Sequence, residues 1–584
     1  MGSSNSVYAN MYCESASQTV NQSRVSVGTE LVTFINRNKQ RLVGFHDYPI
    51  GCQENGRWMI VLPGFGETKT EVLAEAYYFA RNGFHTFRFD YSNHIGESDG
   101  DIVRTTLESL NTDILSSLDH ICGKYRPLKV GAVASSLAAR ALFRAGREDN
   151  RLDLLISLVS VVDLQKTLYN IYREDFLDRV KRGETVGMMD VLGFQVDAGH
   201  FLRSAIANSY ENFQTTIDDI KNINAPIVFF TAERDAWVDL FDVQRLIYAK
   251  PGKRQDLYIL NGAMHELQEN PDVSRAALRG MVSSALQYLC CPGDARPIAK
   301  PTLREIGFRN RKEKLRNKII YESRKDNERE FWKSYLDKYT FVVNVPDYWE
   351  LLTLVHSLLR LEECVHDDIV LDAGCGIGNF GTYALVKRIY TAKQDLVNLL
   401  RPQSLRYLGV DFVREALITA RCTHTQIERE FLGFCGGRNG RRLLEGDYVL
   451  ADLDFKLPLK ENSIGAICCN LVTSYLQNPN QCVESLVRLL KPGGRIVVTS
   501  LKPFADMSQV YRNFINIAKS KSDIYEARKL LSNAGRIKVK EAHGVYEFFS
   551  EDALVKLMNS TGLSEVETFR SLGDQANVVV GVKN

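Results

Sequence analysis

The stretch that decides the fold of the first half of the chain is "KVGAVASSLAARAL", residues 129–142. Its apolar start is typical of a buried strand, and its alanine- and leucine-rich end is typical of a helix. Ser135 and Ser136 lie at the turn between them. Many enzymes place a nucleophilic serine at such a turn, but the usual G-x-S-x-G frame is absent because Ala134 and Ala138 replace the glycines. A serine that only caps the helix is the alternative interpretation.

Strand patterns alternate with helix patterns on both sides of this turn. Apolar runs such as "RWMIV", "LDLLISLVSVV" and "APIVFF" are separated by helical patterns at 102–122 and about 271–290, and a hairpin of two strands is predicted at 29–46. This alternation predicts a mostly parallel, doubly wound α/β sheet. Residues 163–222 break the rhythm and suggest an inserted helical cap.

Chain length and composition limit the class of protein. A length of 584 residues suggests two to four domains, and 45% hydrophobic with 25% charged residues is typical of a soluble globular protein. A net charge of +2 gives no reason to expect nucleic acid or an anionic membrane as the main partner. The twelve cysteines form no C-x-x-C pair, so neither a metal site nor a disulfide framework is predicted, and a reducing cytoplasm is expected.

The amino-terminal segment and the apolar runs carry no membrane signal. No apolar run reaches the roughly 18 residues of a transmembrane segment. The start "MGSSNSVYAN" lacks the basic and apolar regions of a signal peptide, although Gly2 and Ser6 match the N-myristoylation pattern. A flexible leader over residues 1–27 is the simpler interpretation.

A second α/β series follows a break in the chain. The stretch "CCPGDARPIAKPTLREIG", residues 290–307, is rich in proline and glycine and shows no periodicity, which favours a domain boundary. We therefore predict a first domain at 28–292, a linker at 293–318 and a second domain at 319–584. The basic segment that opens the second domain is expected to be the solvated face of a helix.

Three residues in the first domain have the types and the order that acyl transfer requires. Ser136, Asp235 and His265 each follow a predicted strand, in the order serine, aspartate, histidine. Open α/β sheets build their sites at the carboxyl ends of their strands. A nucleophile, a base and an acid that orients the base would thus meet at one edge of the sheet. Ser135 is the competing nucleophile, and the register of the turn favours Ser136.

Backbone donors for the oxyanion are also predicted. The loop "LPGFGE", residues 62–67, follows a strand and is placed to supply the N–H of Phe65. The second N–H would come from Leu137, directly after the nucleophile.

The first domain resembles a known family over about residues 30–290. The stretches "VASSLAARAL", "FFTAERDAWV" and "GAMHELQEN" are similar to those of acyl transferases from bacterial luminescence operons, which are myristoyl-acyl-carrier-protein thioesterases with the same glycine-poor elbow. Ser136, Asp235 and His265 fall on that family's triad positions. The resemblance implies an acyl thioester substrate held on an acyl carrier protein, and it leaves the acyl chain open.

The second domain begins with a glycine-rich loop after a strand, "IVLDAGCGIGNFG", residues 369–381. Glycines allow the backbone to approach a cofactor closely. The next acidic strand end is Asp411, 411 − 372 = 39 residues after Asp372. A dinucleotide-binding dehydrogenase would have its acid about 20 residues on, so this spacing argues against that class.

The ordered motifs over about 320–584 resemble class I S-adenosylmethionine methyltransferases. The resemblance implies a cofactor loop, a ribose site, an adenine site and a loop that faces the methyl group. The residues that it assigns to these parts are Asp372, Gly374, Gly376 and Gly378 for the loop, Asp411 with Phe412 for the ribose, Asp452 with Leu453 for the adenine, and Asn470 for the start of the last loop. Asp447, which could compete with Asp452, is interpreted as a solvated turn residue, and "DQANVVVGVKN" as a terminal antiparallel strand.

Together the halves predict a bifunctional enzyme of two α/β domains. The first would release an acyl or polyketide-like chain from a carrier protein, and the second would methylate the product, as a methyl ester or at a hydroxyl or carbon. The loop "NLVTSYLQ", residues 470–477, contains no histidine or acid that could act as a base, which favours an anionic acceptor. The alternative is a methyltransferase whose hydrolase-like domain only docks the carrier-linked substrate.

Overall fold

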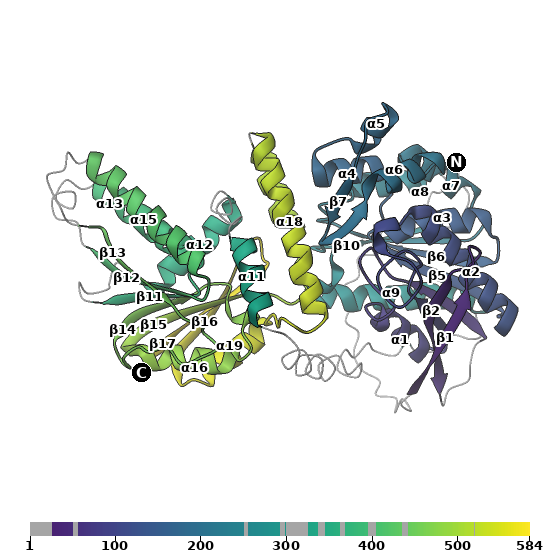
Figure 1. Cartoon of the computed structure of the whole chain (residues 1–584). Coiled ribbons are helices and arrows are strands. Elements are labelled where there is room, and N and C mark those ends of the chain that lie inside the picture. Colours follow the sequence, from purple (N-terminus) through teal and green to yellow (C-terminus); the bar gives the residue numbers. More distant parts are fainter. Residues whose placement is uncertain are drawn as a thin grey trace, which may run out of the picture. The chain divides into compact units, whose positions relative to one another are not determined.

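The structure is a computed structural model in which the chain divides into two compact units, Met1–Arg309 and Asn310–Asn584 (Figure 1). The residues that it describes are 26–50, 56–249, 255–291, 298, 325–336, 345–361, 368–394, 404–434, 442–518 and 520–584. Residues 1–25 of the predicted leader, and the predicted linker apart from Ile298, lie outside the described residues.

The first unit is built on a sheet of eight strands in the order β1-β2-β4-β3-β5-β6-β9-β10. Their bounds are β1 Ser26–Ile35, β2 Arg41–Ile50, β3 Arg57–Leu62, β4 His85–Phe89, β5 Lys129–Ser135, β6 Leu152–Leu158, β9 Ile227–Ala232 and β10 Gln255–Leu260. The pairs β1–β2 and β2–β4 are antiparallel, and all pairs from β4 to β10 are parallel. The predicted hairpin and the mostly parallel sheet are thereby confirmed.

Helices cover both faces of this sheet (Figure 1). The helices of the main layers are α1 Leu73–Arg81, α2 Leu107–Tyr125, α3 Ser136–Glu148, α8 Leu240–Tyr248 and α9 Pro271–Leu289, with short turns η1 Ile102–Arg104 and η2 Leu267–Glu269. Met59 and Val61 of β3 pack with Phe79 of α1 and Met281 of α9 in the buried core of one face. On the other face α2 and α3 lie side by side.

The segment predicted as a helical cap contains four helices and one hairpin. Its elements are α4 Leu164–Tyr172, α5 Phe176–Lys181, β7 Met188–Val191, β8 Phe194–Asp197, α6 Ala198–Ala207 and α7 Phe213–Asn222. The sequence did not predict the antiparallel pair β7–β8. Its two-residue turn has positive φ at Leu192 (52°) and Gly193 (94°), the geometry of a tight hairpin turn. Leucine rarely adopts this conformation, so the turn carried little sequence signal.

The second unit has a sheet of seven strands in the order β13-β12-β11-β14-β15-β17-β16. Their bounds are β11 Ile369–Ala373, β12 Leu405–Asp411, β13 Leu444–Leu450, β14 Ile464–Cys469, β15 Leu490–Leu501, β16 Leu563–Ser571 and β17 Ala576–Lys583. Strands β13 to β15 are parallel, and β17 is antiparallel to both of its neighbours. The predicted terminal antiparallel strand is confirmed.

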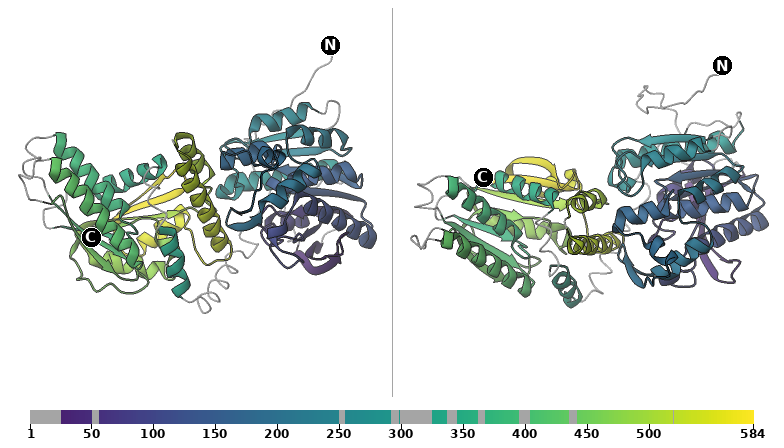
Figure 2. Two further views of the ribbon diagram at one scale, coloured as in Figure 1. Left: turned by 45° about the horizontal axis from the view of Figure 1, so that its top comes forward. Right: turned by 90° about the horizontal axis from the view of Figure 1, so that it is seen from above.

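This second sheet is also covered on both faces, as Figures 1 and 2 show. One face carries α12 Pro346–Leu359, α13 Asn379–Gln394 and α15 Arg414–Phe434, and the other carries α16 Pro479–Leu489 and α19 Glu551–Asn559. The remaining helices are α11 Lys325–Leu336, α17 Ser508–Ile517, α18 Lys521–Ala542 and the turn η6 Thr473–Tyr475. Among the helices described in both units, none has the length and apolar character that a bilayer span requires.

Two candidate active sites

The turn between β5 and α3 separates the two candidate nucleophiles by their backbone conformation. Ser135 ends the strand with extended backbone (φ −111°), whereas Ser136 has a φ of +50°. A non-glycine residue in this left-handed region is strained, and such strain is concentrated at functional turns. Ala134 and Ala138 are fully buried and neither has positive φ. The turn therefore needs small residues at these two places, but it does not need glycine.

Ser136, His265 and Asp235 form a continuous hydrogen-bonded chain. His265 Nε2 lies 3.0 Å from Ser136 Oγ, and His265 Nδ1 lies 2.8 Å from Asp235 Oδ2. The side chains of His265 and Asp235 are 10% and 1% exposed. These distances are those of a nucleophile, a base and an acid that orients the base. The structure thus brings together the three residues that the sequence predicted.

Asp235 is held by the backbone of its own loop. Its Oδ1 accepts the N–H of Trp237 at 2.8 Å and the N–H of Val238 at 3.0 Å, which leaves Oδ2 for His265. The loops after β9 and β10 are joined by a bond from the Arg234 N–H to the Ala263 carbonyl at 2.9 Å. The aspartate and the histidine therefore keep their separation through a backbone contact between neighbouring loops.

The two predicted oxyanion donors lie on either side of the serine turn. Leu137 is the second residue of α3, so its N–H has no carbonyl partner within the helix. Phe65 lies in the loop after β3, and its N–H has no acceptor among the described residues. Leu62 pairs with Ala134, and a Cβ added at Gly64 would come within 3.2 Å of Ser135 Oγ. The loop that carries Phe65 is therefore packed closely against the serine turn.

The glycine-rich loop of the second unit depends on glycine for both conformation and space. Gly374, Gly376 and Gly378 have φ values of +77°, +53° and +80°. A Cβ added at Gly374 would lie 2.4 Å from the side chain of Val472, and one at Gly378 would lie 2.7 Å from Ala420. At Gly376 it would meet only the end of Leu336, at 3.2 Å. The backbone around Gly376 is thus the part of the loop that a ligand could approach.

The two acids beside this loop differ in their partners. Asp411 accepts the N–H of Gly376 at 2.9 Å and that of Val413 at 2.8 Å. Asp372 accepts the hydroxyl of Tyr407 at 2.7 Å. Burial raises the pKa of Asp372 to about 7, with the nearby Asp411 charge adding to the shift, and burial also raises the pKa of Asp411. Asp372 therefore supports the loop from inside, whereas Asp411 fixes the loop backbone directly.

The remaining predicted residues lie at the same edge of the sheet. They are Phe412 after β12, Asp452 and Leu453 after β13, and Asn470 after β14. The Ala451 N–H donates to the Asp411 carbonyl at 3.0 Å, which joins the ends of β12 and β13. Asp452 accepts the N–H of Asp454 at 3.0 Å. Asp447 is exposed, but it lies within β13 and not in a turn.

Comparisons with known proteins divide the chain in the same way. Residues 32–290 match a family model described as acyl transferase, and residues 308–568 match a model described as methyltransferase domain. Acyl transferases of Photobacterium phosphoreum and Aliivibrio fischeri are each 28% identical to the chain, over 235 and 233 residues. Each alignment covers 40% of the chain, with 76% and 75% of the two relatives. The chain is an enzyme whose first half is similar to acyl transferases and whose second half is similar to a methyltransferase domain.

Solved structures are similar to the acyl transferase domain at low identity. Est1E of Butyrivibrio proteoclasticus, solved with ferulic acid, is 17% identical with a TM-score of 0.38, over 44% of the chain and 99% of that protein. The esterase domain of a Rhodothermus marinus protein is 18% identical with a TM-score of 0.34, over 45% and 99%. The predicted fold class, two α/β domains, is confirmed by the two mostly parallel sheets of the structure itself.

The cap contributes a residue to the acyl transferase site that the sequence did not reveal. Phe194 of β8 packs its ring against Phe65 at 6.0 Å between centroids. A Cβ at Gly66, which has a φ of +76°, would lie 2.6 Å from the Phe194 ring. The cap hairpin therefore covers the loop that carries the predicted oxyanion donor. The sequence did not reveal this contact because it did not predict the hairpin that carries Phe194.

The methyltransferase domain has two further supports that sequence reasoning missed. His424 of α15 donates from Nε2 to the Gly378 carbonyl at 2.9 Å and accepts the Tyr448 hydroxyl at Nδ1, at 2.6 Å. Burial lowers the pKa of His424, which keeps the ring neutral for this pairing. His424 thus fixes the carbonyl side of the glycine loop, as Asp411 fixes the N–H side.

Helix α11 covers the glycine loop and the loop that begins at Asn470. Leu336 and Trp332 pack with Ile377, Phe412 and Val413. Trp332 also packs against Tyr475 of η6 at 4.6 Å between ring centroids. The segment predicted to be only a solvated charged face therefore has an apolar side within its described part, formed by the aromatic residues 331, 332 and 335 together with Leu336.

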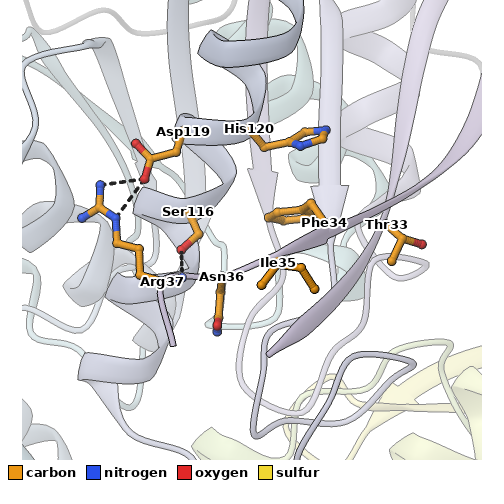
Figure 3. A pocket seen from close by; sticks show the side chains of 8 residues that line it. All are labelled: Thr33, Phe34, Ile35, Asn36, Arg37, Ser116, Asp119 and His120. Carbon is orange, nitrogen blue, oxygen red and sulfur yellow. Dashed lines mark hydrogen bonds and ion pairs between the residues drawn. The ribbon is translucent and has the colours of Figure 1, made fainter. Parts of the chain in front are cut away.

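A separate hollow of about 380 Å³ lies between the end of β1 and α2 (Figure 3). The side chains drawn in Figure 3 show Arg37 turned toward Asp119, with which it pairs at 2.9 Å. The Arg37 N–H also donates to Ser116 Oγ at 3.0 Å. None of the residues that line the hollow belongs to either candidate site.

Proposed function

We propose that the chain is a bifunctional thioesterase and methyltransferase. Its first domain releases an acyl or polyketide-like chain from an acyl carrier protein through an acyl-Ser136 intermediate, and its second domain methylates the released product. The observation that carries this proposal is the hydrogen-bonded chain from Ser136 through His265 to Asp235. Supporting it are the acyl transferase relatives and the methyltransferase model that follows in the same chain.

The acyl transfer step follows from the geometry of this chain of residues. Ser136 Oγ attacks the thioester carbonyl while His265 Nε2 takes its proton, and Asp235 stabilises the imidazolium that forms. The developing oxyanion would accept the N–H groups of Phe65 and Leu137. The C–S bond then breaks, and the carrier thiolate leaves with the proton from His265. Water attacks the acyl-Ser136 ester with His265 as the base, which releases the free acid and restores Ser136.

The residues beside the glycine loop of the second domain fit S-adenosyl-L-methionine. Gly376 has positive φ, and an added Cβ would meet only the end of the flexible Leu336 side chain, at 3.2 Å, so a cofactor could approach the backbone closely here. Asp411 and Asp452 follow neighbouring strands and would hold the ribose and the adenine, with Phe412 and Leu453 beside them. When bound, this cofactor supplies an electrophilic methyl group. The protein's own part is to hold and orient the acceptor and to exclude water.

The polarity of the loop after β14 favours an oxyanion as the acceptor. Thr499 Oγ1 accepts the N–H of Leu471 at 2.7 Å and donates to Asn470 Oδ1 at 2.7 Å. This leaves the Asn470 Nδ2 group as a donor, for which the described residues offer no acceptor. The hydroxyl of Thr473, which is fully buried, likewise has no partner in the described part of the chain. Donors without a nearby base suit a carboxylate, which needs no deprotonation before methylation. The proposed product is therefore a methyl ester.

The test is a two-substrate assay of the full chain. Purified protein is incubated with a medium-chain acyl-carrier-protein thioester and S-adenosyl-L-methionine, and free acid and methyl ester are measured by mass spectrometry. The proposal predicts free acid without S-adenosyl-L-methionine and methyl ester with it. Release of free acid that is never esterified contradicts the ester assignment.

A matched variant separates catalysis from docking. Ser136→Ala should abolish release of the acyl chain and labelling by an alkyl fluorophosphonate, whereas Ser135→Ala should keep both. If release and labelling survive in Ser136→Ala, Ser136 is not the nucleophile. If the parent protein shows neither release nor labelling but still methylates the carrier-linked substrate, the first domain is a docking module.

A further inference from the structure

In the loop after β3, the backbone N–H groups differ in whether they have a hydrogen-bond acceptor. Pro63 has no N–H, the Gly64 N–H donates to Glu67 Oε2 at 2.7 Å, and the Glu67 N–H donates to the Gly64 carbonyl at 3.2 Å. The Gly66 N–H donates to His94 Nε2 at 3.2 Å. Within residues 63–67, only the Phe65 N–H has no acceptor in the described structure. The loop therefore presents one free donor, flanked by two donors that are already bonded.

His94 is suited to accept a backbone N–H. It lies in the loop after β4 and is 4% exposed. Burial lowers the pKa of His94 to about 4, so the ring stays neutral at physiological pH. Because Nε2 accepts from Gly66, the ring proton resides on Nδ1. The ring also packs edge-on against Phe65, at 5.7 Å between centroids, so His94 contacts both residues of the Phe65–Gly66 pair.

The loop that carries His94 is itself held by a buried ion pair, Lys69–Asp90, and by backbone bonds to Asp90. Asp90 Oδ2 accepts Lys69 Nζ at 2.5 Å and the N–H of Glu97 at 2.8 Å, while Asp90 Oδ1 accepts the N–H of Lys69 at 2.7 Å. Lys69 and Asp90 are 3% and 0% exposed. These bonds join the loops after β3 and β4. The loop that carries Gly66 and the loop that carries His94 are therefore linked at a second place besides the Gly66–His94 bond.

We propose that Glu67 and His94 are positioning residues for the oxyanion hole. By accepting the N–H groups of Gly64 and Gly66, they fix the peptide planes before and after the Gly64–Phe65 peptide, and so leave the N–H of that peptide, which belongs to Phe65, directed to the thioester oxyanion. This inference rests on the proposed acyl transfer at Ser136. A peptide plane that can rotate would offer its N–H for only part of the time, and it would stabilise the oxyanion less.

The test uses paired variants in the full chain, with p-nitrophenyl octanoate as substrate and octyl trifluoromethyl ketone as the probe of the oxyanion hole. His94→Leu removes the acceptor, whereas His94→Gln offers an amide oxygen in a similar place. We expect kcat to fall about 10- to 100-fold in His94→Leu with KM within about twofold, and we expect His94→Gln to recover most of the loss. The inhibition constant of the ketone, which forms an oxyanion adduct on the serine, should rise by the same factor as kcat/KM falls.

Glu67→Leu and Glu67→Gln form an independent pair if His94→Leu does not fold, and the same pattern is expected of them. The proposal is overturned if both members of each pair lose activity equally, or if kcat falls while the ketone binds as tightly as before. It is also overturned if the leucine variants are as active as the parent. Failure of the acyl transfer proposal looks different, because Ser136→Ala would then retain full activity with the same substrate.

Discussion

The two candidate sites assign opposite tasks to their buried acids. In the acyl transferase domain, Asp235 points along a chain of side chains that ends at the reacting atom, Ser136 Oγ. In the methyltransferase domain, Asp372 and Asp411 point inward, toward Tyr407 and the loop backbone. In the proposed function, the first site acts through its side chains, whereas the second offers a backbone surface to a cofactor that brings the reactive group.

Asp235 and Asp372 differ in the number of donors around them. Asp235 accepts two backbone N–H groups besides its contact with His265. Asp372 accepts only the hydroxyl of Tyr407 among the described residues, and burial raises its pKa to about 7. Asp411 accepts two backbone N–H groups, as Asp235 does, so Asp372 has the fewest donors of the three acids among the described residues.

The largest expected effect is at the acid of the first site. Asp235→Asn keeps the shape of the residue but favours the wrong histidine tautomer, so acylation of Ser136 should slow by about 10⁴-fold. The rate of fluorophosphonate labelling measures this directly. Asp239→Asn is the control, since this exposed acid near the same loop pairs with Lys166 and should change the rate less than about twofold. Equal losses in the two variants would contradict the assigned role.

The next prediction concerns Asp372 of the second site, which should make the free energy of unfolding depend on pH. Its pKa is raised in the folded state, so the folded domain holds a proton that the unfolded chain releases. The stabilisation is therefore present below about pH 4 and is lost as the pH rises to about 7, by up to about 4 kcal/mol at about 1.4 kcal/mol per unit. Asp372→Asn should flatten this dependence, and Asp447→Asn, at an exposed position, should not.

Calorimetry of the full chain between pH 4 and pH 8 measures how the unfolding of the second domain depends on pH. The transition of this domain is recognised because S-adenosyl-L-methionine should shift it to a higher temperature. A transition in Asp372→Asn that keeps the pH dependence of the parent would show that another group is responsible.

The next effect concerns space at the glycine loop. Gly374→Ala adds a Cβ 2.4 Å from Val472 at a φ of +77°, and we expect cofactor affinity to fall about 100-fold, or by about 2.7 kcal/mol. Gly562→Ala is a matched control, because Gly562 has a φ of +78° and nothing within 4 Å of an added Cβ. Equilibrium dialysis with S-adenosyl-L-methionine measures both. Similar losses would mean that backbone strain, and not the contact with Val472, is decisive.

The smallest effects are expected on α11. Trp332→Ala removes a ring that packs on Tyr475, so the KM of the methyl transfer should rise about 10-fold. Lys333→Ala removes only an exposed ion pair with Glu415, at 2.8 Å, and should change KM less than about twofold. Steady-state methylation kinetics distinguish the two. A larger effect from Lys333 would mean that charge, and not aromatic packing, holds this helix.

The sequence predicted what depends on order and local pattern. The strand ends at Ser136, Asp235 and His265 could be read because parallel strands bring their carboxyl ends to one edge. The same argument placed Asp411, Asp452 and Asn470 together. The class of each domain followed from these ordered motifs, and the family models confirmed it.

What the sequence did not reveal are contacts between distant side chains with no periodic signal. The bonds from Tyr407 to Asp372 and from Gly66 to His94 join different elements, and neither residue pair stands in a motif. The aromatic side of α11 could have been predicted more easily, because its aromatic residues recur at helical spacing inside a charged run. The hairpin that carries Phe194 was hidden by a turn with leucine at positive φ.

The most direct test of two catalytic sites in one chain is the intact mass of the protein after incubation with an acyl-carrier-protein thioester. The account predicts one added acyl group, located at Ser136 by peptide mapping, and it predicts that this adduct forms much more slowly in His265→Ala, because the same base serves acylation and hydrolysis. The adduct should be absent from Ser136→Ala and present in Ser135→Ala. An unmodified protein that still yields methylated product, or an acyl group mapped to Ser135, would contradict it.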